Sequence, residues 1–146
     1  LTLEEKHMTS IPRGLLLSTL LLASTALYAQ SGATLKSGEQ VYRETCMACH
    51  GPGLANAPRF GDRKAWGKLI AEGQAVPTAH GWVGVRGMPP KGGRNDLSLE
   101  EFARAVAYMA RAGGGNWQDP DAPMLERIRA EERKRIEQLQ QKAAKG

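Results

Sequence analysis

The most informative segment of this chain is the run Cys46-Met47-Ala48-Cys49-His50. It contains two cysteines and a histidine at a spacing suited to chemistry. Thiols three positions apart lie within about one helical turn, so each can add to a different vinyl group of one haem and form a thioether. The histidine that follows can then donate an imidazole nitrogen to the iron. Because a C-x-x-C-H run is typical of covalent haem attachment, the sequence predicts a haem site at Cys46, Cys49 and His50.

Other interpretations of this run need partners that the sequence does not supply. A structural zinc site uses about four ligands, but the chain has two cysteines, and His50 directly follows Cys49. A thioredoxin-like redox pair needs a βαβ context, whereas the neighbouring sequence is helical and rich in Gly and Pro. A disulfide across so tight a loop would add little to the stability of a domain. Haem attachment is therefore the favoured interpretation.

A second feature is the G-M-P-P-K-G-G segment over residues 87–93, whose methionine, Met88, follows His50 by 38 positions. The prolines restrict the loop, and the glycines allow the backbone to pass close to a flat cofactor. We expect the thioether of Met88 to be the second axial ligand of the iron. His80 is the alternative, because imidazole is a common ligand of iron.

The N-terminal region has the pattern of a secretory signal peptide. A short, weakly basic stretch at 8–13 precedes an uncharged stretch at 14–27, rich in Leu and Ala. We expect cleavage after Ala29, with Ala26 as the second choice, while 1–7 lies upstream of the first methionine. Covalent haem attachment in bacteria takes place outside the inner membrane, so export to the periplasm agrees with the haem motif. The alternative is an uncleaved membrane anchor.

Composition agrees with a small basic domain. Cleavage would leave 117 residues, enough for one core, with 18 Lys and Arg against 13 Asp and Glu. Most of this excess lies in residues 30–118, which contain 11 basic and 7 acidic side chains. A basic surface steers encounters with acidic partners. We therefore expect redox proteins with acidic docking surfaces, including a membrane oxidoreductase or terminal oxidase, and no nucleic acid.

Capping residues mark three helices. Ser37 predicts the start of a helix that runs into Cys46, and Asp62 predicts a helix that stops at Gly73. Ser98 begins a capping box and a helix that ends at the glycines 113–115. The apolar side chains of this last helix recur at helical spacing: Leu99, Phe102, Ala103, Val106 and Ala110.

Between these helices, residues 74–87 contain Pro77, Gly81 and Gly84. These breaks predict a loop with at most one turn of helix. No strand pattern occurs along the chain, and we therefore expect an all-α fold.

The segment 119–146 is expected to form a charged helical extension, capped by Asp121. Its ion pairs should include Glu131 with Arg135, four positions apart, and Glu132 with the same Arg135. Its apolar stripe is thin and is interrupted by Glu132; it consists of Leu125, Ile128, Ile136 and Leu139. A solvated helix is the expected structure and a docking helix for a partner the alternative. Truncation after Trp117 should then leave the haem spectrum nearly intact.

From Lys36 to Gly113 the chain resembles the class I c-type cytochromes, and among them the small bacterial cytochrome c5-like proteins. The resemblance rests on the G-E-Q-V-Y start at residue 38, the C-M-A-C-H run, Ala57-Pro58, Gly61-Asp62, Trp66, the M-P-P-K-G-G loop and the Ala107-Tyr108-Met109 end of the last helix. Many c5-like proteins carry an additional cysteine pair, which this chain lacks.

The resemblance implies a class I cytochrome c fold wrapped around one covalently bound haem c. Its first and last helices would cross where Gly38 permits a close approach, with Tyr42 packed against Tyr108. Pro58 would accept a hydrogen bond from the ligand histidine, and Trp66 would lie near a haem propionate or pack in the core.

The domain organisation that follows is a signal region at 1–29, a haem domain at 30–118 and the tail at 119–146. The expected function is that of an exported monohaem cytochrome that carries single electrons and is not an enzyme. Three alternatives are a peroxidase, a gas sensor and a fixed haem subunit of a membrane-associated oxidoreductase. The first two need a vacant distal position at the iron, which Met88 would fill.

Overall fold

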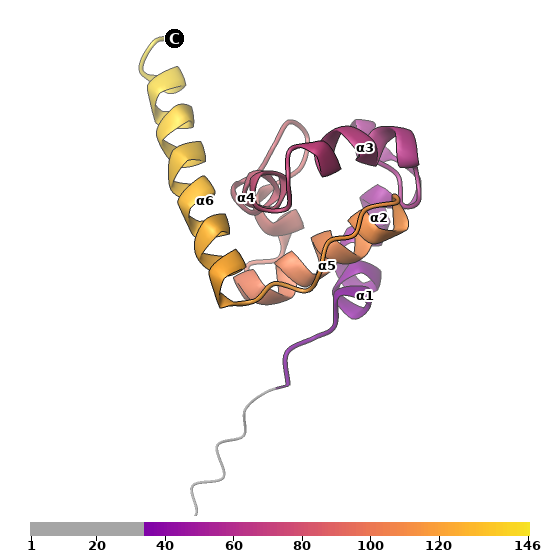
Figure 1. The fold of residues 1–146 in the computed structure, drawn as a ribbon. Helices are drawn as coiled ribbons and strands as arrows, with labels where there is room; N and C mark the ends of the chain where they lie inside the picture. Colours follow the sequence, from indigo (N-terminus) through magenta and orange to yellow (C-terminus); the bar gives the residue numbers. More distant parts are fainter. Residues whose placement is uncertain (1–33) are drawn as a thin grey trace, which may run out of the picture. The chain divides into compact units, whose positions relative to one another are not determined.

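The computed structural model describes residues 34–146, and every regular element in this part of the chain is helical (Figure 1). The predicted signal peptide and its cleavage site lie outside the described residues. The helices are α1 (Gly38–Val41), α2 (Met47–His50), α3 (Arg63–Ala71), α4 (Ala75–Val83), α5 (Leu99–Ala112) and α6 (Ala122–Ala143), with 3-10 turns at Leu54–Asn56 and Pro90–Gly93. The all-α prediction is confirmed. None of the helices in the described part combines the length and apolar character that crossing a membrane requires.

The segment that carries the cysteines is helical throughout. The Ser37 hydroxyl accepts a hydrogen bond from the Gln40 backbone N–H and caps α1. A π-helical turn over Tyr42–Cys46 then connects α1 to α2, which ends at His50. Single π-helical turns are frequent at functional sites. Here the turn ends at Cys46, the first residue of the C-x-x-C-H run.

Helices α1 and α5 make a close approach at Gly38. A Cβ atom at this position would lie 2.2 Å from the Arg104 carbonyl oxygen and 3.1 Å from the Cβ atom of Tyr108. Only glycine fits at this distance. Next to the contact, the rings of Tyr42 and Tyr108 pack with centroids 5.6 Å apart, and Phe60 stacks on Tyr42 at 4.5 Å. The predicted glycine contact and tyrosine pair are therefore confirmed.

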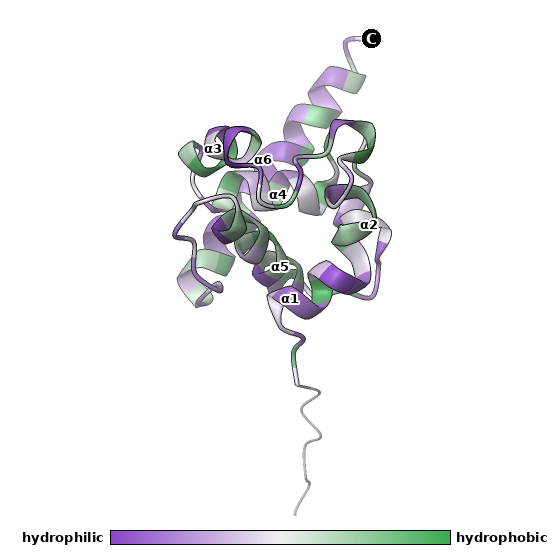
Figure 2. Ribbon diagram, turned by 90° about the vertical axis from the view of Figure 1, so that its right-hand side faces the viewer, coloured by the Kyte–Doolittle hydropathy of each residue, from purple (hydrophilic) through white to green (hydrophobic). Residues whose placement is uncertain are grey.

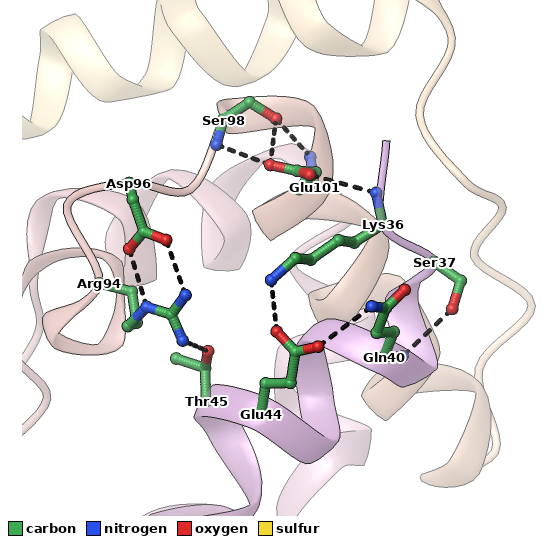
Figure 3. Close-up of polar contacts among 9 residues, drawn as sticks. All are labelled: Lys36, Ser37, Gln40, Glu44, Thr45, Arg94, Asp96, Ser98 and Glu101. Atoms are coloured by element: carbon green, nitrogen blue, oxygen red, sulfur yellow. Dashed lines mark hydrogen bonds and ion pairs between the residues drawn. The ribbon is translucent and has the colours of Figure 1, made fainter. Parts of the chain in front are cut away.

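Polar contacts join the start of α1 to the start of α5 (Figure 3). The Glu101 carboxylate accepts hydrogen bonds from the backbone N–H groups of Lys36 at 3.1 Å and Ser98 at 3.0 Å. In return, the Ser98 hydroxyl accepts from the Glu101 N–H, which completes the predicted capping box. The N–H of Lys36 and that of Ser98 lower the pKa of Glu101. The ionised carboxylate thus joins the start of α1 to the start of α5.

Helix α3 begins as predicted. The Asp62 carboxylate accepts hydrogen bonds from the backbone N–H groups of Lys64 and Ala65. The helix ends at Ala71, two residues before Gly73, which adopts a left-handed conformation with φ of 83°. On its inner side α3 buries Trp66.

The prediction for residues 74–87 is wrong, because α4 spans nine of them. Pro77 is the third residue of α4, where its missing N–H costs no hydrogen bond. Gly81 lies inside the helix, at a point where neighbouring side chains leave little room for a Cβ atom. A Cβ atom there would lie 3.1 Å from the Phe102 ring and 3.5 Å from the methyl carbon of Met88. Both residues are therefore compatible with a helix here, and Gly81 allows the Phe102 ring to pack closely against α4.

The tail forms the predicted helix, with Asp121 as its cap, but the expectation of a solvated helix is wrong for its first half. Ile128 is fully buried against Ala79 of α4 and Ala103 of α5. The Trp82 indole N–H of α4 donates a hydrogen bond of 3.0 Å to the Glu132 carboxylate. Figure 1 shows α6 beside α4, and Figure 2 shows mainly hydrophilic colours on its C-terminal half. The basis for a harmless truncation after Trp117 is thereby removed.

Candidate functional site

A cavity of about 520 Å³ lies among α2, α3, α4, α5 and the loop that follows α4. Its size falls within the range of about 300–1,000 Å³ that is usual for cofactor sites. The cavity brings together all six predicted site residues: Cys46, Cys49, His50, Pro58, Trp66 and Met88.

The two cysteines differ in their surroundings. Cys46 is buried and Cys49 is exposed, and both are free thiols in this structure. Burial, with a smaller effect from Cys49, raises the pKa of the Cys46 thiol to about 12. The sulfur of Cys46 therefore belongs to the inner wall of the cavity, while that of Cys49 lies at its edge.

His50 is buried at the end of α2 and lines the same cavity. Its Nδ1 atom lies 2.9 Å from the Pro58 carbonyl oxygen. When Nδ1 carries the proton and donates to this carbonyl, Nε2 is left with a free lone pair. The contact that the resemblance implied for Pro58 is thus present. It holds the imidazole ring in one orientation.

Met88 is half-buried in the loop between α4 and α5. The loop doubles back at this point: Val85 and Met88 exchange two backbone hydrogen bonds, of 3.1 and 2.9 Å. The Met88 side chain packs against the core and borders the cavity. His80, the alternative ligand, also lines the cavity, from α4. Burial, followed by the nearby charge of Arg135, lowers the pKa of His80.

Trp66 lines the cavity from α3, but its indole N–H is already engaged. It donates a hydrogen bond of 3.0 Å to the carbonyl oxygen of Arg59. The side chain is buried, and its ring lies 6.5 Å from the ring of His50, measured between centroids. Trp66 therefore offers an apolar ring to the cavity, and the packing role agrees best with this geometry.

Sequence reasoning missed several residues of the cavity wall. Leu69, Phe102 and Val106 supply apolar surface, and the periodicity of their helices marked the last two as core residues only. Arg135 of α6 also lines the cavity. Nothing in its sequence context indicates this position, because two glutamates at helical spacing account for its charge.

The cavity fits a haem on its own chemistry. Its wall combines two thiols, an imidazole and a thioether, which are the groups that bond haem edges and haem iron in c-type sites. The remaining surface includes aromatic and aliphatic side chains, which suit a flat apolar cofactor. Glycine at position 81 keeps Phe102 and Met88 close to α4. The residues present therefore fit a covalently attached haem, which Cys46, Cys49, His50 and Met88 would hold.

Comparison with known proteins gives a consistent result. Cytochrome c-555 of Chlorobaculum thiosulfatiphilum is 40% identical over 77 residues, which are 50% of this chain and 90% of that protein. Cytochrome c5 of Azotobacter vinelandii is 40% identical over 82 residues, 54% of this chain and 98% of that protein. A chain from a crystal structure of an electron transfer complex of nitrite reductase with cytochrome c matches with a TM-score of 0.51 and 41% identity, covering 52% of this chain and 93% of that one.

The family described as "Cytochrome C oxidase, cbb3-type, subunit III" matches residues 33–109, slightly more than half of the chain. The relatives are cytochromes by name, and the fold is that of a class I cytochrome c. The match includes the cysteines and ends within α5, so α6 lies outside it. With its C-x-x-C-H run on the wall of a cavity of suitable size, this chain belongs to that family of cytochrome c domains and carries one covalently bound haem c.

Proposed function

We propose that this chain is an exported monohaem cytochrome that carries single electrons between redox proteins and performs no catalysis of its own. One observation carries the proposal: the cavity brings the C-x-x-C-H segment and Met88 to the same space, although 38 residues separate His50 from Met88. The family relatives agree with this role, because they are named as cytochromes c-555 and c5.

In this proposal each site residue has one task. Cys46 and Cys49 attach the haem through thioethers, and His50 Nε2 binds the iron while its Nδ1–H donates to the Pro58 carbonyl. The thioether of Met88 binds the iron from the opposite side.

The bound haem supplies an iron that gains and loses one electron. The residues of the chain keep this exchange simple. A sulfur ligand favours the reduced state and raises the potential relative to a site with two imidazoles. Phe102 and Met109 are buried beside the cavity and exclude water from it. Since His50 is buried and Met88 is packed against the core, the two side chains that would hold the iron would move little when it changes oxidation state. The site also leaves no position for peroxide or a gas.

Redox proteins with acidic docking surfaces are the proposed partners. Residues 30–118 carry 11 basic and 7 acidic side chains, and such an excess steers association with a partner of opposite charge. A relative in complex with nitrite reductase supports a redox protein as partner.

Carbon monoxide and a redox partner together test the function. The reduced holoprotein should bind carbon monoxide poorly at neutral pH, yet exchange electrons quickly with an acidic redox protein. The exchange rate should fall as salt rises, because the Debye length shortens from about 30 Å at 0.01 M to about 10 Å at 0.1 M. Stopped-flow oxidation across a salt series measures both the rate and its salt dependence.

Each possible outcome tests a different part of this proposal. Fast binding of carbon monoxide would replace the carrier by an open haem of the peroxidase or sensor kind. A rate independent of salt would remove the acidic partner but keep the carrier. As a control on attachment, the haem of the wild-type protein should resist extraction by acidified organic solvent, and that of the Cys46→Ala/Cys49→Ala variant should not.

We further propose export to the periplasm with cleavage after Ala29. The sequence pattern of residues 8–29 supports this. Periplasmic protein should then begin near Gln30, as measured by N-terminal sequencing of the purified holoprotein. Recovery in the membrane fraction alone, with residues 14–27 retained, would favour the alternative of a fixed haem subunit in a membrane-associated oxidoreductase. The description of the matched family, an oxidase subunit, is the observation that keeps this alternative.

A further inference from the structure

The C-terminal helix α6 reaches the haem cavity through one side chain, Arg135. This residue lies in the cavity wall, although α6 is outside the segment that matches the cytochrome family. The same wall contains Glu72, His80 and Arg86. Burial lowers the pKa of His80, as do the charges of Arg135 and Arg86, whereas Glu72 and Glu131 act in the opposite direction, so these charged groups lie near His80.

Two contacts fix the position of Arg135. Ile128, seven residues earlier and therefore on the same face of α6, is fully buried against the core. Glu132 accepts a hydrogen bond from the Trp82 indole at 3.0 Å. With both contacts in place, α6 can neither slide nor rotate along α4. Arg135 is thereby held beside the cavity.

The carboxylates expected to pair with Arg135 are engaged elsewhere. Glu131 pairs with Lys134 at 2.8 Å, and Glu132 accepts from Trp82. Among the ion pairs of the described residues, none includes Arg135. Its Nε atom is buried and has no hydrogen-bond partner. A buried donor without an acceptor costs about 1–3 kcal/mol, so an acceptor supplied from the cavity that Arg135 lines would stabilise the protein.

We propose that the guanidinium group of Arg135 binds a propionate carboxylate of the haem. This inference rests on the haem site proposed above. The propionates are the only anionic groups on the porphyrin edge, and a planar guanidinium matches a carboxylate in a two-point contact. Binding there would satisfy the buried Nε–H. It would also give α6, which lies outside the segment that matches the cytochrome family, a role in the haem site.

A positive charge close to the haem stabilises the reduced iron relative to the oxidised iron. Removing it should therefore lower the midpoint potential. We expect Arg135→Gln to change the equilibrium constant for reduction at least threefold, which is about 28 mV at 59 mV per tenfold change for one electron.

The experiment uses full-length holoprotein with three variants. Arg135→Gln removes the charge, Arg135→Lys keeps it, and Arg133→Gln removes the same charge from an exposed position on the same helix. The midpoint potential and the propionate bending mode in the resonance Raman spectrum are measured for each. Arg135→Gln should lower the potential and shift the bending mode. Arg135→Lys should restore most of the potential, and Arg133→Gln should leave both values unchanged.

Two results would overturn the proposal: an unchanged propionate mode in Arg135→Gln, or equal changes of potential in Arg135→Gln and Arg133→Gln. The proposed haem site is checked separately, on the wild-type protein, by covalent retention of haem and by the near-infrared band of sulfur-to-iron ligation. Loss of these wild-type signals would refute the haem site itself. Their presence together with a silent Arg135→Gln variant would refute only the role of Arg135.

Discussion

Replacing Met88 with Ala is expected to open the haem iron. The variant should lose the weak near-infrared sulfur-to-iron band of the oxidised protein, because it lacks the thioether that we propose as the iron ligand. Reduced protein should bind carbon monoxide fast and stoichiometrically. The midpoint potential should fall by on the order of 0.1 V, within the span of about 0.8 V over which axial ligands set haem potentials. Absorption spectroscopy, flash photolysis with carbon monoxide and redox titration measure the three effects.

Two matched variants show whether the effect belongs to Met88. Met109 is a second methionine in the cavity wall, buried on α5, and Met109→Leu nearly conserves volume. His80→Ala removes the alternative ligand from the same wall. Both variants should keep the near-infrared band and resist carbon monoxide. A band that survives in Met88→Ala but disappears in Met109→Leu would move the sulfur ligand to α5, and an effect of His80→Ala alone would support ligation by histidine.

Local signals predicted much of this molecule from its sequence. The caps at Ser37, Asp62 and Ser98 act over two or three residues, and each helix starts where its cap places it. The C-x-x-C-H run is similarly self-contained, since its chemistry depends on spacing within one turn. Such features need no knowledge of the rest of the fold.

Features that depend on distant partners were not predictable in the same way. The sequence predicts a break at Gly81, but its environment is set by Phe102, 21 positions away, whose ring would lie 3.1 Å from a Cβ atom there. Glu132 seemed to interrupt an apolar stripe, but its carboxylate accepts from Trp82, 50 positions earlier. In both cases the local sequence pattern has its usual meaning, but contacts with distant residues determine the structure.

These distant contacts make the tail part of the stability of the haem domain. Ile128→Ala should lower the free energy of unfolding of the holoprotein by about 2–4 kcal/mol, because a fully buried isoleucine loses its contacts and leaves a cavity. The side chain packs with Ala79, Leu99 and Ala103, which are small or fixed on α4 and α5 and so cannot fill the space. Urea unfolding followed by haem absorbance and by circular dichroism measures the change.

Ile136 provides the control on the same helix, since it is the same residue type with 40% of its surface exposed. Ile136→Ala should change the free energy of unfolding by less than about 1 kcal/mol. If Ile128→Ala lowers the free energy of unfolding strongly and Ile136→Ala lowers it little, the first half of α6 is docked and the second half is solvated. Equal, small losses would instead return α6 to the solvated helix expected from sequence. In that case truncation after Trp117 would leave the free energy of unfolding unchanged. If α6 is docked, the truncated protein should have a lower free energy of unfolding than the Ile128→Ala variant.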